Sequence, residues 1–199
     1  MEPTLAIEKT YWQKGIQHIA GIDEVGRGCL AGPVVAAAVV FPPGVAVPEV
    51  NDSKKLSLQK RERLSKVILD MAVSVGVGLC TPEEIDVLNI LHASMEAMRR
   101  AVSNLVPSPD FLLVDGNRCF PDSPWPFETV IKGDAKSSTI AAASIIAKTT
   151  RDAMMMDLHE QFPDYGWDTN VGYPTKKHYE ALALHGITPL HRKSFRLNR

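Results

Sequence analysis

The chain has 199 residues, of which 45% are hydrophobic and 23% are charged, and its formal net charge is −1. This composition is typical of one globular domain and argues against disorder, collagen-like structure and a disulfide-rich scaffold. The longest uninterrupted apolar run, residues 34–41, is too short to cross a bilayer, and the first residues do not resemble an export signal. We therefore expect a cytoplasmic protein that has no contact with a membrane.

Charge is unevenly distributed along the sequence. Residues 174–199 contain six Lys and Arg residues and one Glu, whereas residues 1–173 carry a surplus of negative charge. A basic end beside an acidic body is typical of an enzyme that binds a polyanion at a carboxylate site, because phosphates attract cations and metal ions bind carboxylates. Taken alone, the pattern favours an ordinary solvated tail.

The hydrophobic pattern predicts strands and helices in one continuous fold. Strands are expected at residues 16–22, 34–41, 73–80, 111–114 and 128–132. Helices are expected after Ser57, after the capping box that begins at Thr81, and over residues 89–105, 139–158 and 175–185. Three early strands, followed by strands that alternate with helices, predict an α/β domain built around a mixed sheet.

Acidic residues stand where three of these strands end. Asp23 and Glu24 follow the first strand. Asp115 follows the fourth strand, and Asp134 follows the fifth. If these strands are parallel neighbours, their carboxyl ends meet at one edge of the sheet, where open α/β sheets usually place a site. Common turn chemistry explains each acid alone, but their joint occurrence favours a functional site.

Four carboxylates at one edge would repel one another unless hard divalent cations lay between them. All-oxygen ligands suit Mg²⁺ or Mn²⁺. Two such cations about 4 Å apart can activate a water molecule on one side of a phosphodiester and stabilise the leaving oxygen on the other. The acids therefore predict metal-dependent phosphoryl chemistry.

Other familiar sites are missing from the sequence. It has no GxxxxGK[ST] phosphate loop, no GxSxG elbow and no HExxH zinc motif. Its six histidines show no ligand spacing, and we expect His178 and His185 to be capping or surface residues.

A series of motifs, taken in order, resembles bacterial ribonuclease HII, the type 2 ribonuclease H. The motifs are GIDEVGRG at 21–28, NDSKKL at 51–56, LNILHA at 88–93, VDGN at 114–117, KGD at 132–134, IAAASIIAK at 140–148, GYPT at 172–175 and HRKSF at 191–195. Any one of them could arise by chance, whereas the ordered set spans nearly the whole chain and is highly specific.

The resemblance implies a single RNase H-like domain over residues 1–199, with a mixed five-stranded sheet flanked by helices and a helical substrate-binding segment at about 160–199. It implies a metal-dependent endoribonuclease that hydrolyses the RNA strand of RNA/DNA hybrids. Such an enzyme also nicks duplex DNA on the 5′ side of embedded ribonucleotides and leaves 3′-hydroxyl and 5′-phosphate ends. Carried over by position, the catalytic and metal-binding residues are Asp23, Glu24, Asp115 and Asp134, with Mn²⁺ or Mg²⁺ as the cofactor.

The resemblance also implies how the substrate is recognised. Gly26-Arg27-Gly28 would read the ribose, because backbone groups without a neighbouring Cβ can approach a 2′-hydroxyl closely. Tyr173 would lie on the sugar of the following deoxynucleotide, where an extra hydroxyl would be crowded. Lys54 and Lys55 would contact phosphates. Without the resemblance, a tight turn and a half-buried aromatic residue explain the first two features.

Two positions depart from the family pattern. Val171 stands where the family often has a lysine, which puts one basic substrate contact in doubt, and Thr149 replaces an apolar residue. We expect a monomer, and the residues after Phe195 do not resemble a clamp-docking peptide.

Two alternatives stay open at this point. Type 3 ribonuclease H shares the fold and the chemistry but has an N-terminal substrate-binding domain and a Gly-Lys-Gly turn, whereas this chain has Arg27 in the turn and 22 residues before Asp23. A non-catalytic nucleic-acid-binding module of the same fold would have no need of all four acids.

Overall fold

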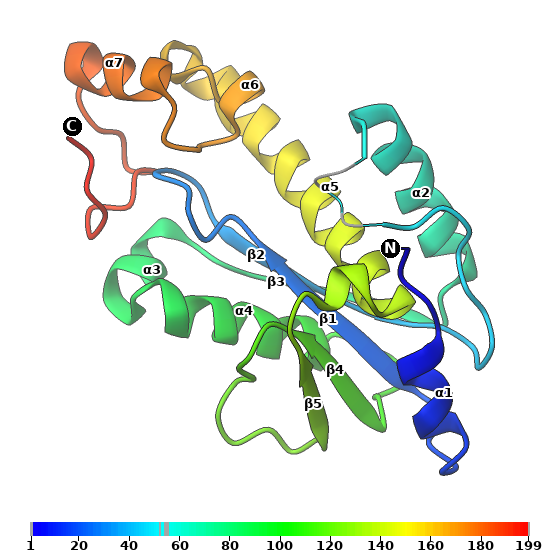
Figure 1. Ribbon diagram of the computed structural model, residues 1–199. Coiled ribbons are helices and arrows are strands. Elements are labelled where there is room, and N and C mark those ends of the chain that lie inside the picture. The colour runs from blue at the N-terminus through cyan, green and yellow to red at the C-terminus, as the bar shows by residue number, and fades with distance from the viewer. Residues whose placement is uncertain (1, 52, 54–55, 199) are drawn as a thin grey trace.

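A five-stranded mixed sheet lies at the centre of the computed structural model, which describes residues 2–51, 53 and 56–198 (Figure 1). β1 pairs antiparallel with β2 and parallel with β4, and β4 pairs parallel with β5. The mixed five-stranded sheet expected from the sequence is thus confirmed. In the spatial order β3-β2-β1-β4-β5, the strands are β3 (Ser74–Cys80), β2 (Val34–Val40), β1 (Ile19–Val25), β4 (Phe111–Asp115) and β5 (Phe127–Val130).

Helices cover both faces of the sheet. α2 (Leu58–Met71) and α5 (Ser138–Gln161) pack on one face, whereas α3 (Pro82–Leu88) and α4 (Ile90–Ser103) pack on the other. β2 is buried along its whole length because it lies between both layers, which explains why its sequence is an uninterrupted apolar run. Alanines in the first half of α5 let this helix approach the sheet closely.

The helices begin where their capping residues predict. Ser57 accepts a backbone hydrogen bond at the start of α2, and Thr81 and Glu84 form the predicted capping box of α3. Ser137 caps α5 in the same way. Each cap satisfies a backbone N–H that has no acceptor within its own helix.

A short helix that the sequence pattern did not predict precedes the sheet. α1 (Ala6–Trp12) places Tyr11 on the ring of Phe111 in β4, with 4.1 Å between the ring centroids. Other side chains of α1 pack beside Ile140 of α5. The N-terminal residues therefore cover one end of the sheet and the start of α5.

Residues after α5 form a second cluster at the far end of that helix (Figure 1). This C-terminal segment contains η3 (Pro163–Tyr165), α6 (Trp167–Asn170) and α7 (Lys176–His185). Trp167 is fully buried there against Met155 of α5 and Leu30 of the loop after β1. Among the described residues, no helix is both long enough and apolar enough to cross a membrane.

Two predicted strand boundaries are wrong in a way that matters for the acids. β1 continues to Val25 because residues 20–25 pair with β2, so Asp23 and Glu24 lie within the strand and not after it. β5 ends at Val130, so Asp134 lies in the 3-10 turn η2 (Gly133–Ala135) and not directly at a strand end.

His178 and His191 are fully buried in the C-terminal segment, so the expected capping or surface position of His178 is wrong. Trp167 donates from Nε1 to Nε2 of His178 at 3.2 Å, and the Nε2 atoms of the two histidines are 3.1 Å apart. Nδ1 of His178 faces the carbonyl of Tyr173 at 3.0 Å, and the backbone N–H of Thr188 donates to Nδ1 of His191 at 3.0 Å. These contacts are all satisfied only while both rings are neutral.

Acid is expected to destabilise the fold through this histidine pair. Burial lowers the pKa of His191 from 6.5 to about 4, and burial also lowers the pKa of His178. In that pH range the unfolded chain binds protons that the folded chain does not. The free energy of unfolding therefore falls as the pH drops from 6.5, by at most about 1.4 kcal/mol per pH unit for each proton. Urea unfolding at about pH 7 and about pH 5 measures this loss. His191→Gln should show a smaller loss, and an equal loss would contradict the prediction.

Candidate functional site

The acids of β1 and β4 lie side by side at one edge of the sheet. Ile22 pairs with Val114 in the parallel ladder, so Asp23 and Asp115 are the next residues of two adjacent strands that run in the same direction. The backbone N–H of Gly133 donates to Oδ1 of Asp115 at 2.6 Å, which brings the η2 turn to the same edge. Asp23, Glu24 and Asp115 therefore lie close together at this edge, and Asp134 lies in the turn bonded to Asp115.

Burial and mutual repulsion act on these carboxyl groups. Asp23 is only 8% exposed, and burial, followed by the nearby charges of Glu24 and Asp115, raises its pKa well above the ordinary value. Burial also raises the pKa of Glu24, although the guanidinium of Arg27 opposes this effect. The surroundings of this edge therefore stabilise the ionised form of these carboxyl groups poorly.

Each of these three carboxylates has its own hydrogen-bond donor. Asp23 accepts from the backbone N–H of Glu24 at 2.7 Å, and the nearby Ser144 hydroxyl lowers its pKa. Arg27 donates to Oε1 of Glu24 at 3.2 Å, and Gly133 holds Asp115. In the part of the chain that is described, no three carboxylate, imidazole or thiol groups form a complete metal-binding cluster in this side-chain arrangement.

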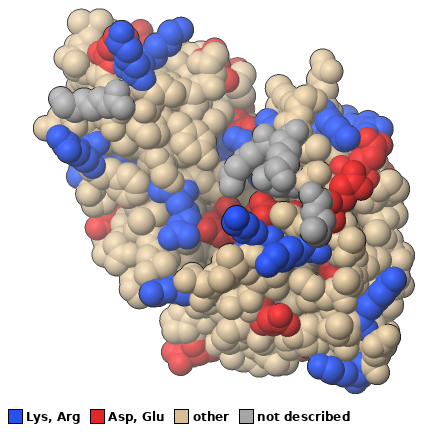
Figure 2. Space-filling view, viewed as in Figure 1, with Lys and Arg blue, Asp and Glu red and all other residues tan. Residues whose placement is uncertain are grey.

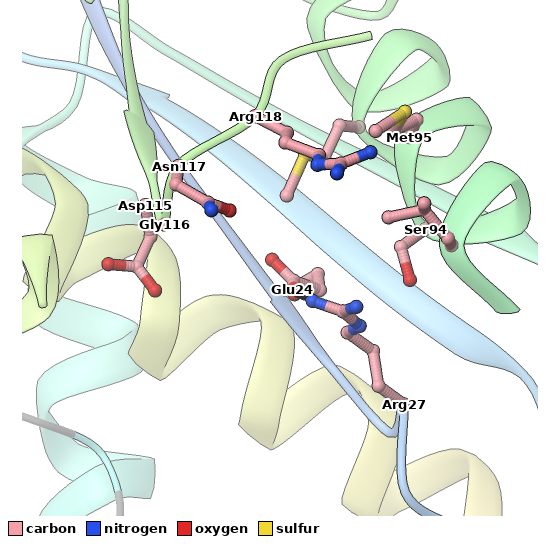
Figure 3. A pocket seen from close by; sticks show the side chains of 10 residues that line it. Glu24, Arg27, Ser94, Met95, Asp115, Gly116, Asn117 and Arg118 are labelled. Atoms are coloured by element: carbon pink, nitrogen blue, oxygen red, sulfur yellow. Dashed lines mark hydrogen bonds and ion pairs between the residues drawn. The ribbon is translucent and has the colours of Figure 1, made fainter. Parts of the chain in front are cut away.

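Two hollows meet at Glu24. The first has a volume of about 360 Å³, and Figure 3 shows Glu24 there between Asp115 on one side and Arg27 on the other. Its remaining walls come from residues 116–118 and from α4. The second also has a volume of about 360 Å³ and contains Tyr173. Its lining residues are Asp23, Glu24, Val25, Ser53, Ser144, Lys148 and Tyr173.

The glycines of the turn after β1 differ in their surroundings. Gly26 is buried with φ +93°, and a Cβ there would lie 2.3 Å from Nε of Arg151. Gly28 is exposed, and a Cβ there would meet nothing within 4 Å. The missing Cβ of Gly26 therefore makes room for packing inside the protein, whereas the backbone at Gly28 is open. Recognition of a ribose by residues 26–28 stays a prediction.

Two buried arginines donate hydrogen bonds to backbone carbonyls of this turn and of the residues that follow it. Arg151 and Arg192 are both 0% exposed. Arg151 donates from Nε to the Pro33 carbonyl at 2.9 Å, and Arg192 donates from a terminal nitrogen to the Arg27 carbonyl at 3.1 Å and twice to that of Gly32. Burial, with the nearby charge of Arg151, lowers the pKa of Arg192 to about 10. Carbonyl dipoles thus fix the loop and partly offset two buried positive charges.

Tyr173 lines the second hollow together with Asp23 and Glu24. Its ring is partly buried, and Nζ of Lys148 is 5.9 Å from the ring centroid. The backbone N–H of Tyr173 donates to the carbonyl of Asn170 at 2.8 Å, and the carbonyl of Tyr173 faces Nδ1 of His178. The backbone on which the ring stands is therefore anchored from two sides.

The structure describes Val171 but not the two lysines that were predicted to contact phosphates. Lys54 and Lys55 lie outside the described residues. Val171 adopts φ +41°, and its carbonyl accepts a hydrogen bond from Arg151 at 2.8 Å, so its backbone supports the buried arginine. Figure 2 shows acidic atoms near the centre of the face seen in Figure 1, bordered by Lys and Arg side chains.

Sequence reasoning did not single out several residues that surround the acids. Ser144, Lys148 and Arg151 are four and three residues apart on α5, so they share the helix face that looks toward β1 and the turn. Their helical spacing was a signal that could have found them. Arg118, which lines the first hollow, follows the VDGN motif directly and carried no periodic signal.

Comparisons with known proteins agree with this geometry. The family model described as Ribonuclease HII matches residues 20–198. A relative named Ribonuclease HII from Salinibacter ruber is 58% identical over 198 residues, which cover 98% of this chain and 99% of the relative. Another, from Ruegeria pomeroyi, is 56% identical, with coverage of 98% of this chain and 83% of the relative.

A solved structure has the same fold. The crystal structure of the ribonuclease H2 from Pyrococcus horikoshii OT3 superposes with a TM-score of 0.74 and 28% identity, and the match covers 90% of this chain and 94% of the other. The family model names the type 2 enzyme and spans almost all of the sequence, which decides against the type 3 alternative. The chain therefore belongs to the ribonuclease HII family and is a hydrolase of the ribonuclease H type.

Proposed function

We propose that this chain hydrolyses the RNA strand of RNA/DNA hybrids and nicks duplex DNA on the 5′ side of embedded ribonucleotides, leaving 3′-hydroxyl and 5′-phosphate ends. The observation that carries the proposal is the meeting of Asp23, Glu24 and Asp115 beside two hollows, one lined also by Arg27 and the other by Tyr173. An acidic edge can bind the cations that phosphodiester hydrolysis uses, and the turn and the ring flank this edge where sugars would lie.

Mg²⁺ or Mn²⁺ fits the donors at this edge. The donors are carboxylate oxygens, which hard cations prefer. Burial, followed by repulsion from Glu24 and Asp115, raises the pKa of Asp23, and a cation between the carboxylates would relieve that repulsion. We assign Asp23, Glu24, Asp115 and Asp134 as the ligands. Two bound cations would supply an activated water molecule and stabilise the leaving 3′ oxygen.

Neighbouring groups would orient the acids and the substrate. The backbone N–H groups of Glu24 and Gly133 hold the carboxylates of Asp23 and Asp115 in place. Arg27, whose side chain is half exposed, provides positive charge beside Glu24 where a phosphate would approach. Lys54 and Lys55 are proposed as further phosphate contacts, which fix the register of a duplex without reading its sequence.

Ribose recognition is proposed for the turn and the tyrosine. The open backbone at Gly28 leaves room for a sugar, and a backbone N–H and C=O can together contact a 2′-hydroxyl whatever the base. The ring of Tyr173 would lie on the next sugar, where only a deoxyribose fits. Together these contacts would select an RNA-to-DNA junction.

A nicking assay on duplex DNA with one ribonucleotide tests the proposal. With Mg²⁺ or Mn²⁺ present, we expect one cut on the 5′ side of the ribonucleotide and a product with a 3′-hydroxyl. An all-DNA duplex should stay intact, and an RNA/DNA hybrid should be cut at many positions. A shift of the duplex without a nick would contradict enzymatic cleavage. A 2′,3′-cyclic phosphate would show that the 2′-hydroxyl, and not water, attacks.

Tyr173→Ala is expected to weaken the preference for an RNA-to-DNA junction more than it weakens duplex binding. Loss of a stacked ring costs about 1–3 kcal/mol, which corresponds to roughly 5- to 150-fold in cleavage at the junction. Tyr173→Phe keeps the ring and serves as the matched control. Cleavage rates on single-ribonucleotide and all-RNA strands, with binding measured in parallel, provide the comparison. Equal losses on both substrates would count against stacking on the sugar.

A further inference from the structure

Glu8 is a buried carboxylate that lies outside the region matched by the family model. It is 0% exposed on α1, whereas the match begins at residue 20. Its Oε1 accepts from the Ser137 hydroxyl at 2.6 Å, from the backbone N–H of Thr139 at 3.1 Å, and from the Thr139 hydroxyl. Among the described residues Oε2 has no partner. One oxygen from the N-terminal helix thus holds the first turn of α5.

The residues just before α1 attach to the same place. The backbone N–H of Thr4 donates to the carbonyl of Lys136 at 3.1 Å, and the N–H of Ser138 donates to the carbonyl of Thr4 at 3.0 Å. In Figure 1 the dark-blue N-terminal arm accordingly lies beside the start of α5. Residues 136–139 are therefore held by a backbone pairing and by a carboxylate.

This held segment is continuous with the turn that carries Asp134. The carbonyl of Gly133 accepts from the N–H groups of Lys136 at 2.9 Å and Ser137 at 2.8 Å, while the N–H of Gly133 donates to Asp115. Asp134 lies between these bonds. Its backbone is thus fixed by Asp115 on one side and, on the other, by the segment that Glu8 holds.

The same turn of α5 also lies directly on β1. A Cβ at Gly21 would be 2.3 Å from the carbonyl carbon of Thr139, so the two backbones are in close contact two residues before Asp23. A shift of the α5 start would therefore change the distance between Asp134 and the acids of β1 and β4.

We infer that Glu8 is a positioning residue for the acidic edge, because its hydrogen bonds to Ser137 and Thr139 set the place of Asp134 relative to Asp23 and Asp115. The inference rests on the proposed function, in which Asp134 is a metal ligand. Groups that hold a ligand in place typically change metal affinity by about 10- to 100-fold when they are removed.

Calorimetric titration of the full chain with Mn²⁺, without substrate, tests this role. Glu8→Ala should weaken Mn²⁺ binding about tenfold. Glu8→Gln should keep most of the affinity, because the amide oxygen can accept the same bonds. Thr139→Val removes one donor from a side chain of similar shape, so it should fold even if Glu8→Ala does not and should weaken binding by a smaller factor. Cleavage at saturating Mn²⁺ should recover in these variants, with the KM for the duplex near that of the wild type.

The control is Asp110→Ala. Asp110 also ties residues near the N-terminus to the body, since it accepts from the N–H groups of Gln17 and His18, but it does so at the opposite end of β1. Its loss should lower stability without changing Mn²⁺ affinity. Wild-type affinity in both Glu8→Ala and Thr139→Val, or an equal loss in Asp110→Ala, would overturn the inference. Wild-type affinity in Asp134→Asn would instead refute the ligand assignment on which the inference rests.

Discussion

Replacing Asp115 with asparagine is expected to lower the rate of phosphodiester cleavage by about a thousandfold, the size of effect that follows loss of a group that stabilises reacting charge. The fold should survive this change. The amide oxygen of asparagine can still accept the 2.6 Å hydrogen bond from Gly133. Removal of one charge also relieves the repulsion that acts on Asp23, so stability without metal should stay equal or rise.

Single-turnover cleavage and thermal unfolding of the same preparation measure both parts of this prediction. Asp110→Asn is the matched control, because Asp110 precedes the same strand at its other end. The control should cleave at close to the wild-type rate. Near wild-type turnover in Asp115→Asn would remove Asp115 from the reaction, and an unfolded variant would assign it a structural role.

Gly26→Ala is expected to give the largest loss of stability among substitutions in the turn. The residue has φ +93°, a conformation that costs an L-residue about 1–2 kcal/mol. The new Cβ would also lie 2.3 Å from Nε of Arg151, a buried group that is bonded to the Pro33 carbonyl and cannot move freely. We expect the free energy of unfolding to fall by about 3 kcal/mol or more.

Gly28→Ala is the matched substitution two residues away. Nothing lies within 4 Å of the new Cβ, so urea unfolding should show a change within about 0.5 kcal/mol. Cleavage at a single ribonucleotide should nevertheless fall about tenfold or more, because the methyl group occupies the space proposed for the sugar. Equal losses of stability in the two variants would contradict the different roles of the two glycines. Unchanged cleavage by Gly28→Ala would contradict backbone recognition at that position.

Several strands and helix starts could be predicted because they depend on local patterns. The apolar run of β2 predicts a buried strand, and Ser57 and Thr81 predict where two helices begin. The end of β1 was misplaced because its last residues, including Asp23 and Glu24, are acidic and carry no strand signal of their own. They stay in the strand because they pair with Ala37 and Ala36 of β2, which local sequence does not reveal.

Contacts between distant segments were beyond such reasoning. Arg151 lies in the middle of α5, and its hydrogen-bond acceptors are backbone carbonyls of other segments, such as those of Pro33 and Val171. Side-chain types therefore give no hint of its partners. His178 was expected to be a capping or surface residue, but its ring is buried because Trp167, His191 and a carbonyl satisfy both nitrogens. His185, in contrast, is exposed as expected.

The N-terminal helix was missed for a similar reason. α1 has only seven residues, and its N-cap residue, Leu5, has no side chain that can accept a hydrogen bond. Neither the length of the segment nor a capping residue therefore predicted a helix. Glu8 reads as a surface charge on so short a segment, and its burial becomes evident only when α5 is placed beside it.

Binding of Mn²⁺ to the wild type and to the four single variants Asp23→Asn, Glu24→Gln, Asp115→Asn and Asp134→Asn tests most directly whether these acids share divalent cations. Electron paramagnetic resonance of free Mn²⁺ during titration counts the bound ions. The expected result is saturable binding to the wild type and a loss of affinity of about tenfold or more in each variant. Wild-type affinity in all four variants would contradict a metal site at this edge of the sheet.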